Sequence, residues 1–114
     1  MGAPQTGFTF TTPTQNSDGS ACVVGEVTEY VAQITPANGA EVDHAFTAPA
    51  TWVPGSSQNI PFTALIPPFV PSVGISYKAD MEAADASGIS IPSGSISWTQ
   101  GGPMPDAPTN LTVQ

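Results

Sequence analysis

The sequence predicts an all-β protein, a sandwich of about seven strands. Thirteen Pro and eleven Gly divide the chain into short runs that are rich in Val, Ile, Thr and aromatic residues. The stretch Ile75–Ser93 begins with apolar and polar side chains in strict alternation, the pattern of a strand with one buried face. A chain of 114 residues has the length of one domain with its own core.

The first two strands follow from alternation and from the turn between them. Phe8 and Phe10 fall on one face of a strand that Pro13 ends. A turn is expected over Gln15–Ser20, because Asp-Gly within it suits a positive-φ geometry. The next strand is predicted over Glu26–Ile34, with one face made of Thr28, Tyr30, Ala32 and Ile34.

The middle of the chain is punctuated by proline. A turn at Pro36–Gly39 leads into a short strand at Val42–Thr47, and Pro49–Ser57 is expected to be a loop that carries Trp52. A further strand should contain Ile60 and Phe62, with the intervening Pro61 at an edge or bulge.

The most regular strand opens the Ile75–Ser93 stretch. Its apolar face holds Ile75, Tyr77, Ala79, Met81 and Ala83. The chain is predicted to turn at Asp85–Gly88 and to return as a second arm from Ser90, interrupted at Pro92–Gly94 and resumed at Ser95–Thr99.

The charge balance limits the partners. Nine acidic residues, one Lys and no Arg give a net charge of −8. Nucleic-acid binding needs several Lys and Arg to displace phosphate counterions, so we expect no nucleic-acid partner. No apolar run approaches 18 residues, so no membrane span is expected either. With only 9% charged residues, the surface should be a largely neutral polar coat.

The lone Cys22 and the first residues point to the compartment of synthesis. A single cysteine excludes an internal disulfide, which favours a reducing compartment. The segment Met1–Thr6 has neither a basic region nor an apolar run, so no signal peptide is expected.

No catalytic, cofactor or metal site is expected. His44 is the only histidine and has no second ligand at zinc spacing, so it is interpreted as a satisfied surface or edge residue. Asp80, Glu82 and Asp85 lack the loop pattern of a calcium site and are interpreted as a solvated strand face. Cys22, beside two valines, is expected to be a small core residue and not a reactive thiol.

Two parts of the sequence also resemble a known family of β-sandwich domains. Tyr77, Ala79, Met81, Ala83 and Asp85, followed by Gly88 and Pro92-Ser93, resemble the F strand, the F–G turn and the early G strand of a fibronectin type III domain. Phe8–Pro13 is similar to the B strand, with Phe10 where the family usually has Trp, and Tyr30 is similar to the C-strand aromatic residue.

The resemblance implies an immunoglobulin-like sandwich over residues 1–104. It also implies that Tyr77 packs inward and sends its hydroxyl to a backbone group between Pro67 and Ser72, as in a tyrosine corner. The apolar, proline-rich segment Ile66–Pro71 is longer than the family's loop and departs from that pattern.

The last ten residues, 105–114, resemble the A strand that opens such a domain, although they follow the G strand here. Two explanations stay open. The segment is a linker or the remnant of a following repeat, or it supplies an A strand to another subunit. In the second case the strand at Phe8–Thr11 has an open edge, and Leu111 and Val113 enter the core of the acceptor.

A second candidate contact surface is Ile66–Pro71 together with Trp52. Phe69 and Val70 are apolar residues in a proline-stiffened loop, which is typical of a contact site on a surface. The alternative is that they cover one end of the sandwich core.

These features favour a non-enzymatic structural protein. Such a sandwich resembles a bacteriophage virion component, a capsid decoration or tail accessory protein made in the host cytoplasm, with protein subunits as partners in a homo-oligomer or larger assembly. The alternative is a spacer or carbohydrate-binding module of a secreted bacterial enzyme or adhesin, in which Trp52 and Phe69 stack on sugars.

Overall fold

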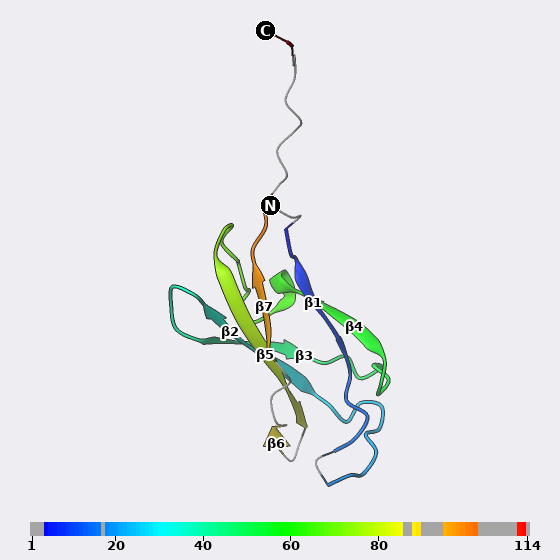
Figure 1. The fold of residues 1–114 in the computed structure, drawn as a ribbon. Helices are drawn as coiled ribbons and strands as arrows, with labels where there is room; N and C mark the ends of the chain where they lie inside the picture. The colour runs from blue at the N-terminus through cyan, green and yellow to red at the C-terminus, as the bar shows by residue number, and fades with distance from the viewer. Residues whose placement is uncertain (1–3, 17, 86–87, 90–94, 103–111, 114) are drawn as a thin grey trace.

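The computed structural model has two antiparallel sheets that enclose one core (Figure 1). It describes residues 4–16, 18–85, 88–89, 95–102 and 112–113. The smaller sheet pairs β1 with β4, and the larger one has the order β3-β2-β5, with β6 and β7 both on the far side of β5. The all-β, two-sheet architecture expected from the sequence is thereby confirmed. The strands are β1 (Gly7–Thr11), β2 (Glu29–Pro36), β3 (Val42–Thr47), β4 (Ser57–Pro61), β5 (Ser76–Asp85), β6 (Gly88–Ile89) and β7 (Ile96–Thr99).

The ten-residue strand β5 lies in the middle of the larger sheet. It pairs with β2 along one edge and with β6 and β7 along the other. Tyr77 and Ala79 are buried while Ser76 and Lys78 are exposed, as the alternation predicts. The predicted turn at Asp85–Gly88 includes residues 86 and 87, and the interruption at Pro92–Gly94 is also part of the chain that the structure leaves undescribed.

The strand predicted over Glu26–Ile34 is shifted along the chain. β2 begins at Glu29, because Glu26 still belongs to a turn in which its N–H donates to the Val23 carbonyl. Tyr30, Ala32 and Ile34 of the predicted inward face are all buried, whereas Thr28 is exposed and precedes the strand. The turn after it closes where the Gly39 N–H donates to the Pro36 carbonyl.

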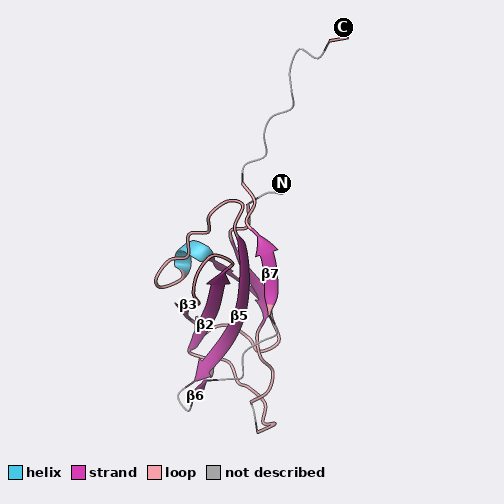
Figure 2. Cartoon of the chain, turned by 60° about the vertical axis from the view of Figure 1, so that its left-hand side comes forward, coloured by secondary structure: helices cyan, strands magenta, loops and turns pink. Residues whose placement is uncertain are grey.

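Phe62 was expected in a strand but lies in a single turn of 3-10 helix, Phe62–Ala64 (Figure 2). The Phe62 N–H donates to the Thr6 carbonyl, and the Leu65 N–H donates back to the Phe62 carbonyl, which closes the turn. The strand therefore ends at Pro61, and the Phe62 ring still reaches the core.

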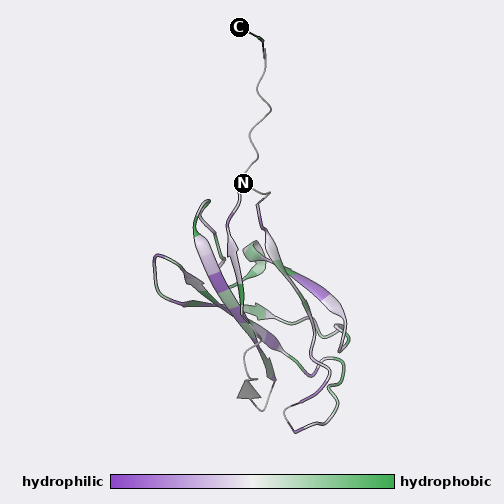
Figure 3. Ribbon diagram, in the orientation of Figure 1, coloured by the Kyte–Doolittle hydropathy of each residue, from purple (hydrophilic) through white to green (hydrophobic). Residues whose placement is uncertain are grey.

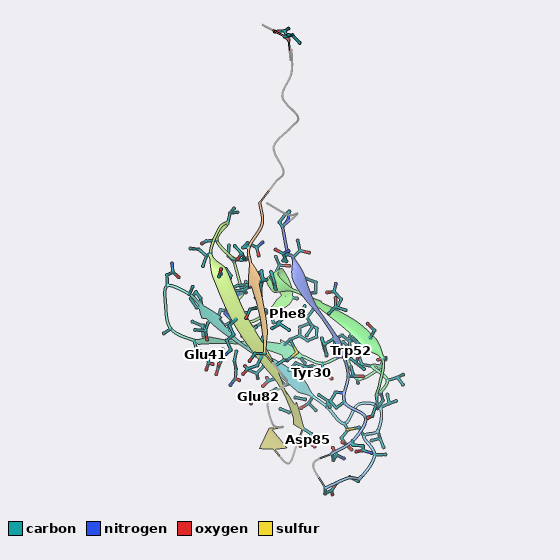
Figure 4. The ribbon with its side chains drawn as sticks, in the orientation of Figure 1. Phe8, Tyr30, Glu41, Trp52, Glu82 and Asp85 are labelled. Atoms are coloured by element: carbon teal, nitrogen blue, oxygen red, sulfur yellow. The ribbon has the colours of Figure 1, made fainter. Side chains whose placement is uncertain are left out.

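Aromatic rings fill the space between the sheets. Phe8, Phe62, Phe69, Tyr77 and Trp98 contact one another at one end of the core. At the other end a second group consists of Phe10, Tyr30, Phe46 and Trp52. Figure 4 shows Phe8, Tyr30 and Trp52 between the two layers. Met81 is half-buried and packs against this core, so the residues that the sequence suggested as structural (Phe10, Tyr30, Tyr77 and Met81) all contribute to it.

Candidate interaction surfaces

The loop Ile66–Pro71 is fixed on the outer edge of β3. Ala45 and Ile66 exchange two backbone hydrogen bonds of 2.9 and 2.8 Å. His44 Nδ1 lies 2.6 Å from the Pro67 carbonyl oxygen, so Nδ1 carries the proton that it donates. His44 is satisfied and lies on an edge strand, as expected, although its side chain is buried. The loop thus covers an edge that would otherwise be open.

Phe69, a predicted contact residue, is a core residue. Only 8% of its surface is exposed, and its ring makes edge contacts with His44, Phe62 and Tyr77. Its N–H donates to the Phe62 carbonyl, which turns the side chain inward. The alternative interpretation, that this loop covers one end of the core, is correct for Phe69. Val70 points away and is 81% exposed, so it remains a candidate contact residue.

Tyr77 makes the contact that the sequence predicts. Its hydroxyl oxygen accepts a hydrogen bond of 2.8 Å from the Ser72 N–H, and its ring is buried. The partner is a backbone donor, so the tyrosine oxygen is the acceptor. This bond fixes the segment that precedes β5 to the core.

Trp52 is not an exposed stacking platform. It is half-buried and packs on Phe10, Tyr30 and Phe46, with ring centroids 6.0, 5.9 and 5.6 Å away. Beside it lies a cavity of about 20 Å³, which holds about one water molecule. Phe69 is buried as well, so the two rings do not form an exposed stacking surface.

Cys22 lines the same small cavity and is half-buried. Its Sγ lies 3.5 Å from Asn16 Oδ1. Burial raises the pKa of the thiol, and the hydrogen bond and negative charge of Glu26 raise this pKa further. The neutral thiol is favoured, but Cys22 is not the core residue that was expected, because it lies outside the buried cluster.

The acidic residues of β5 are less solvated than expected. Asp80, Glu82 and Asp85 are half-buried, and one oxygen of Asp80 is buried without a hydrogen-bond partner. Within the described ranges, no three His, Cys, Asp or Glu side chains come together in a way that would hold a metal ion. These ranges also contain no helix with the length and hydropathy to cross a membrane.

One edge of the smaller sheet is open. The bonds at Thr6 and Thr12 show that even-numbered residues of β1 face β4: Phe62 N–H donates to the Thr6 carbonyl, and Thr12 N–H donates to the Ser56 carbonyl. Because the bonding direction alternates along an antiparallel strand, the N–H and C=O groups of the odd-numbered residues face away from β4. Among the described residues no strand pairs with that side. The residues concerned are Gly7, Thr9 and Thr11.

Two of the other outer edges are protected. The outward positions of β4 include Pro61, which has no N–H to offer, and the loop at Ile66 covers β3. β1 has neither a proline nor a charged side chain. The free edge of β1 is therefore a suitable place on the described sheets for another strand to pair.

Exposed apolar residues gather at both ends of the sandwich. Val70 and Val73 lie at the end where β7 finishes, since Gly74 N–H donates to the Gln100 carbonyl. Val23, Val24 and Val53 are exposed at the opposite end, near the end of β1, where Thr12 Oγ1 donates to the Val53 carbonyl at 2.8 Å. Figure 3 shows hydrophobic colour in the loops at both ends and hydrophilic colour along β4.

The sequence identified part of these surfaces. It predicted the open edge of β1 and the contact residue Val70, but it did not single out Val23, Val24 or Val53, although consecutive valines before a glycine in a loop were a usable signal. Val113 is fully exposed, while Leu111 and the rest of 103–111 are outside the described residues.

No family model, no curated protein and no solved structure matches this chain.

Proposed function

We propose that this chain is a non-enzymatic structural subunit that works by pairing with neighbouring protein subunits. The observation that carries the proposal is the unprotected edge of β1, which offers the outward backbone groups of Gly7, Thr9 and Thr11 to a strand from another chain. A protein that works as a monomer usually blocks such an edge, as this one does at Pro61 and at Ile66.

We further propose that the domain is of the fibronectin type III class. Two features support this. β2 and β7 lie on either side of β5, which is the C–F–G order of an immunoglobulin-like sandwich. The Tyr77 hydroxyl also bonds to the backbone five residues upstream, as a tyrosine corner does.

The assembly that this function fits best is a virus particle, with the chain as a capsid decoration or tail accessory protein of a bacteriophage. A free thiol and a polar sequence with few charged residues suit a protein that is made in a host cytoplasm and released by lysis. The alternative role as a carbohydrate-binding module is less favoured, because Phe69 is buried and Trp52 is packed among other rings.

Purified particles test the assignment. Particles from lysed cultures of the strain that encodes this chain should contain it at a fixed ratio to the major capsid or tail protein, as measured by quantitative mass spectrometry after density-gradient purification. Its presence only in the secreted fraction of unlysed cells, together with binding on a glycan array that Trp52→Ala abolishes, would support the alternative role instead.

A further inference from the structure

The direction of β1 determines how a strand can add to it. Gln100 Nε2 donates to the Gln5 carbonyl at 3.0 Å, and the Gly101 N–H donates to Gln5 Oε1 at 3.3 Å. The end of β7 and the beginning of β1 therefore share one end of the sandwich, which we call the β7 pole (the upper end in Figure 1). β1 runs from this pole toward the opposite pole, where Val23 and Val53 lie.

Every strand pair in the described structure is antiparallel. An antiparallel partner of β1 has to enter at the opposite pole and run toward the β7 pole. The chain after Gly102 starts at the β7 pole, which is the wrong end for its own β1. To pair with β1 of the same subunit, this segment has to run the length of β1, reverse its direction and return. A neighbouring copy that presents its opposite pole can accept the segment without such a reversal.

The composition of residues 105–114 suits this role. Leu111 and Val113 alternate with Asn110, Thr112 and Gln114, so a strand over these residues has one apolar face. That face can pack beside Phe8 and Phe10, which occupy the inward positions of β1. Two prolines earlier in the segment favour an extended chain as far as the acceptor.

The exposed apolar residues at the two poles and the distribution of charge also favour pairing between two copies. A head-to-tail contact brings Val70 and Val73 of one copy against Val23 and Val53 of the next, which covers apolar side chains that are exposed in the single chain. The acidic residues of the strands lie on the larger sheet, while β1 and β4 have no charged side chain. The strand residues at this edge therefore add no charge repulsion between copies.

We propose that residues 105–114 of one copy add as an antiparallel strand to the free edge of β1 in a second copy, so that copies join head to tail. The inference rests on the proposed structural role but not on the virion assignment. Because the donor segment and the acceptor edge are different surfaces, the contact is heterologous and produces a ring or an open filament.

Two full-length variants test this by complementation. Leu111→Asp/Val113→Asp removes the apolar face of the donor. Thr9→Pro removes one outward N–H of the acceptor edge and leaves the bonds to β4 in place. In sedimentation velocity, the unmodified chain should show a mass that rises with concentration, and each variant alone should stay monomeric with an unchanged circular dichroism spectrum. An equimolar mixture should form dimers and nothing larger, since only one donor and one acceptor remain.

A matched control and a second measurement complete the test. Asn110→Asp/Thr112→Asp adds the same two charges on the other face of the strand. The factor by which it lowers the association constant should be about ten times smaller than the factor for the Leu111/Val113 variant. In the unmodified chain, amide exchange at Gly7, Thr9 and Thr11 should slow as the concentration rises. This exchange also decides the question if Thr9→Pro fails to fold.

Three results would overturn the inference: a mixture without dimers, an unmodified chain that stays monomeric to about 1 mM, the range in which weak tethered contacts act, or association that leaves the β1 amides unchanged. Each differs from a failure of the proposed function. A chain that is found in particles but does not self-associate keeps its structural role and docks on a different protein.

Discussion

At the scale of single residues, packing and hydrogen bonds stabilise this fold. Lys78 is the only lysine or arginine, so ion pairs contribute little. Polar groups inside the fold are mostly tied to the backbone: Tyr77 to Ser72, His44 to Pro67 and Thr12 to Val53. Losing one such bond leaves a poorly solvated group without a partner, and this costs more than the bond itself contributes.

Tyr77→Phe should lower the free energy of unfolding by about 1–2 kcal/mol, because the Ser72 N–H loses its acceptor. Urea denaturation followed by tryptophan fluorescence measures the change. Tyr30→Phe is the matched control, since it removes the hydroxyl of another buried tyrosine without affecting the Ser72 bond, and it should cost less than about 0.5 kcal/mol. Equal effects of the two substitutions would contradict the assigned role of the Ser72 bond.

Cys22 should react slowly with alkylating reagents. Burial raises the pKa of its thiol, so less thiolate is present in the folded chain than in the unfolded chain at the same pH. The rate with iodoacetamide at pH 8 should be at least severalfold lower in buffer than in denaturing urea. Glu26→Gln, which removes the charge beside the thiol, should increase the rate in the folded chain. A folded-state rate as high as the unfolded-state rate would show that the thiol is open to solvent.

At the scale of elements, the loop Ile66–Pro71 completes the larger sheet. It bridges to β3 at Ala45, accepts a bond from His44 and buries Phe69 among other rings. It therefore acts as part of the core and not as a separate docking arm.

Phe69→Ser should destabilise the fold by about 3–5 kcal/mol, since a buried ring is replaced by a small polar side chain. Val70→Ser, at the neighbouring exposed position, should change the stability by less than about 0.5 kcal/mol. Thermal unfolding by circular dichroism compares the two. If both substitutions leave the melting temperature unchanged, the loop is not part of the core.

The alternation of apolar and polar residues made the strands predictable. The positions of Phe62 and Phe69 were harder to predict, because they depend on hydrogen bonds and packing in the loops. β1, β2 and β5 keep a strict period of two, so their inward faces (Phe8, Tyr30 and Tyr77 among them) followed from the sequence. Phe62 was misplaced because only the bonds of its neighbours show that the chain curls into a helical turn. The burial of Phe69 could not be predicted, because the sequence of an apolar residue between prolines is the same whether the loop faces the core or the solvent.

The open edge of β1 was expected from the family resemblance, because the segment that resembles its partner strand stands at residues 105–114. The protection of β3 was not predictable, since it comes from a loop more than 20 residues further on. The apolar poles were not predictable, since valines in loops become a surface only when the fold brings distant loops to one end.

At the scale of the whole molecule, a strongly acidic chain has to associate against its own charge. Each copy carries a net charge of −8. Burial of Leu111 and Val113 would contribute roughly 3–5 kcal/mol before the cost of ordering the donor segment. A contact of this strength is weak unless several copies are held together on a larger assembly.

Association between copies should therefore become stronger as salt is added. The Debye length falls from about 10 Å at 0.1 M salt to about 3 Å at 1 M, which screens the repulsion between the acidic larger sheets. The proposed contact consists of backbone hydrogen bonds and apolar side chains. Because Lys78 is the only lysine or arginine that can form an ion pair between copies, salt removes little electrostatic attraction. Sedimentation equilibrium of the unmodified chain in 20, 100 and 500 mM NaCl should show a steadily rising association constant. The Leu111→Asp/Val113→Asp variant should remain monomeric throughout. Association that weakens with salt would mean that opposite charges hold the copies together, and this would place the contact away from the uncharged edge of β1.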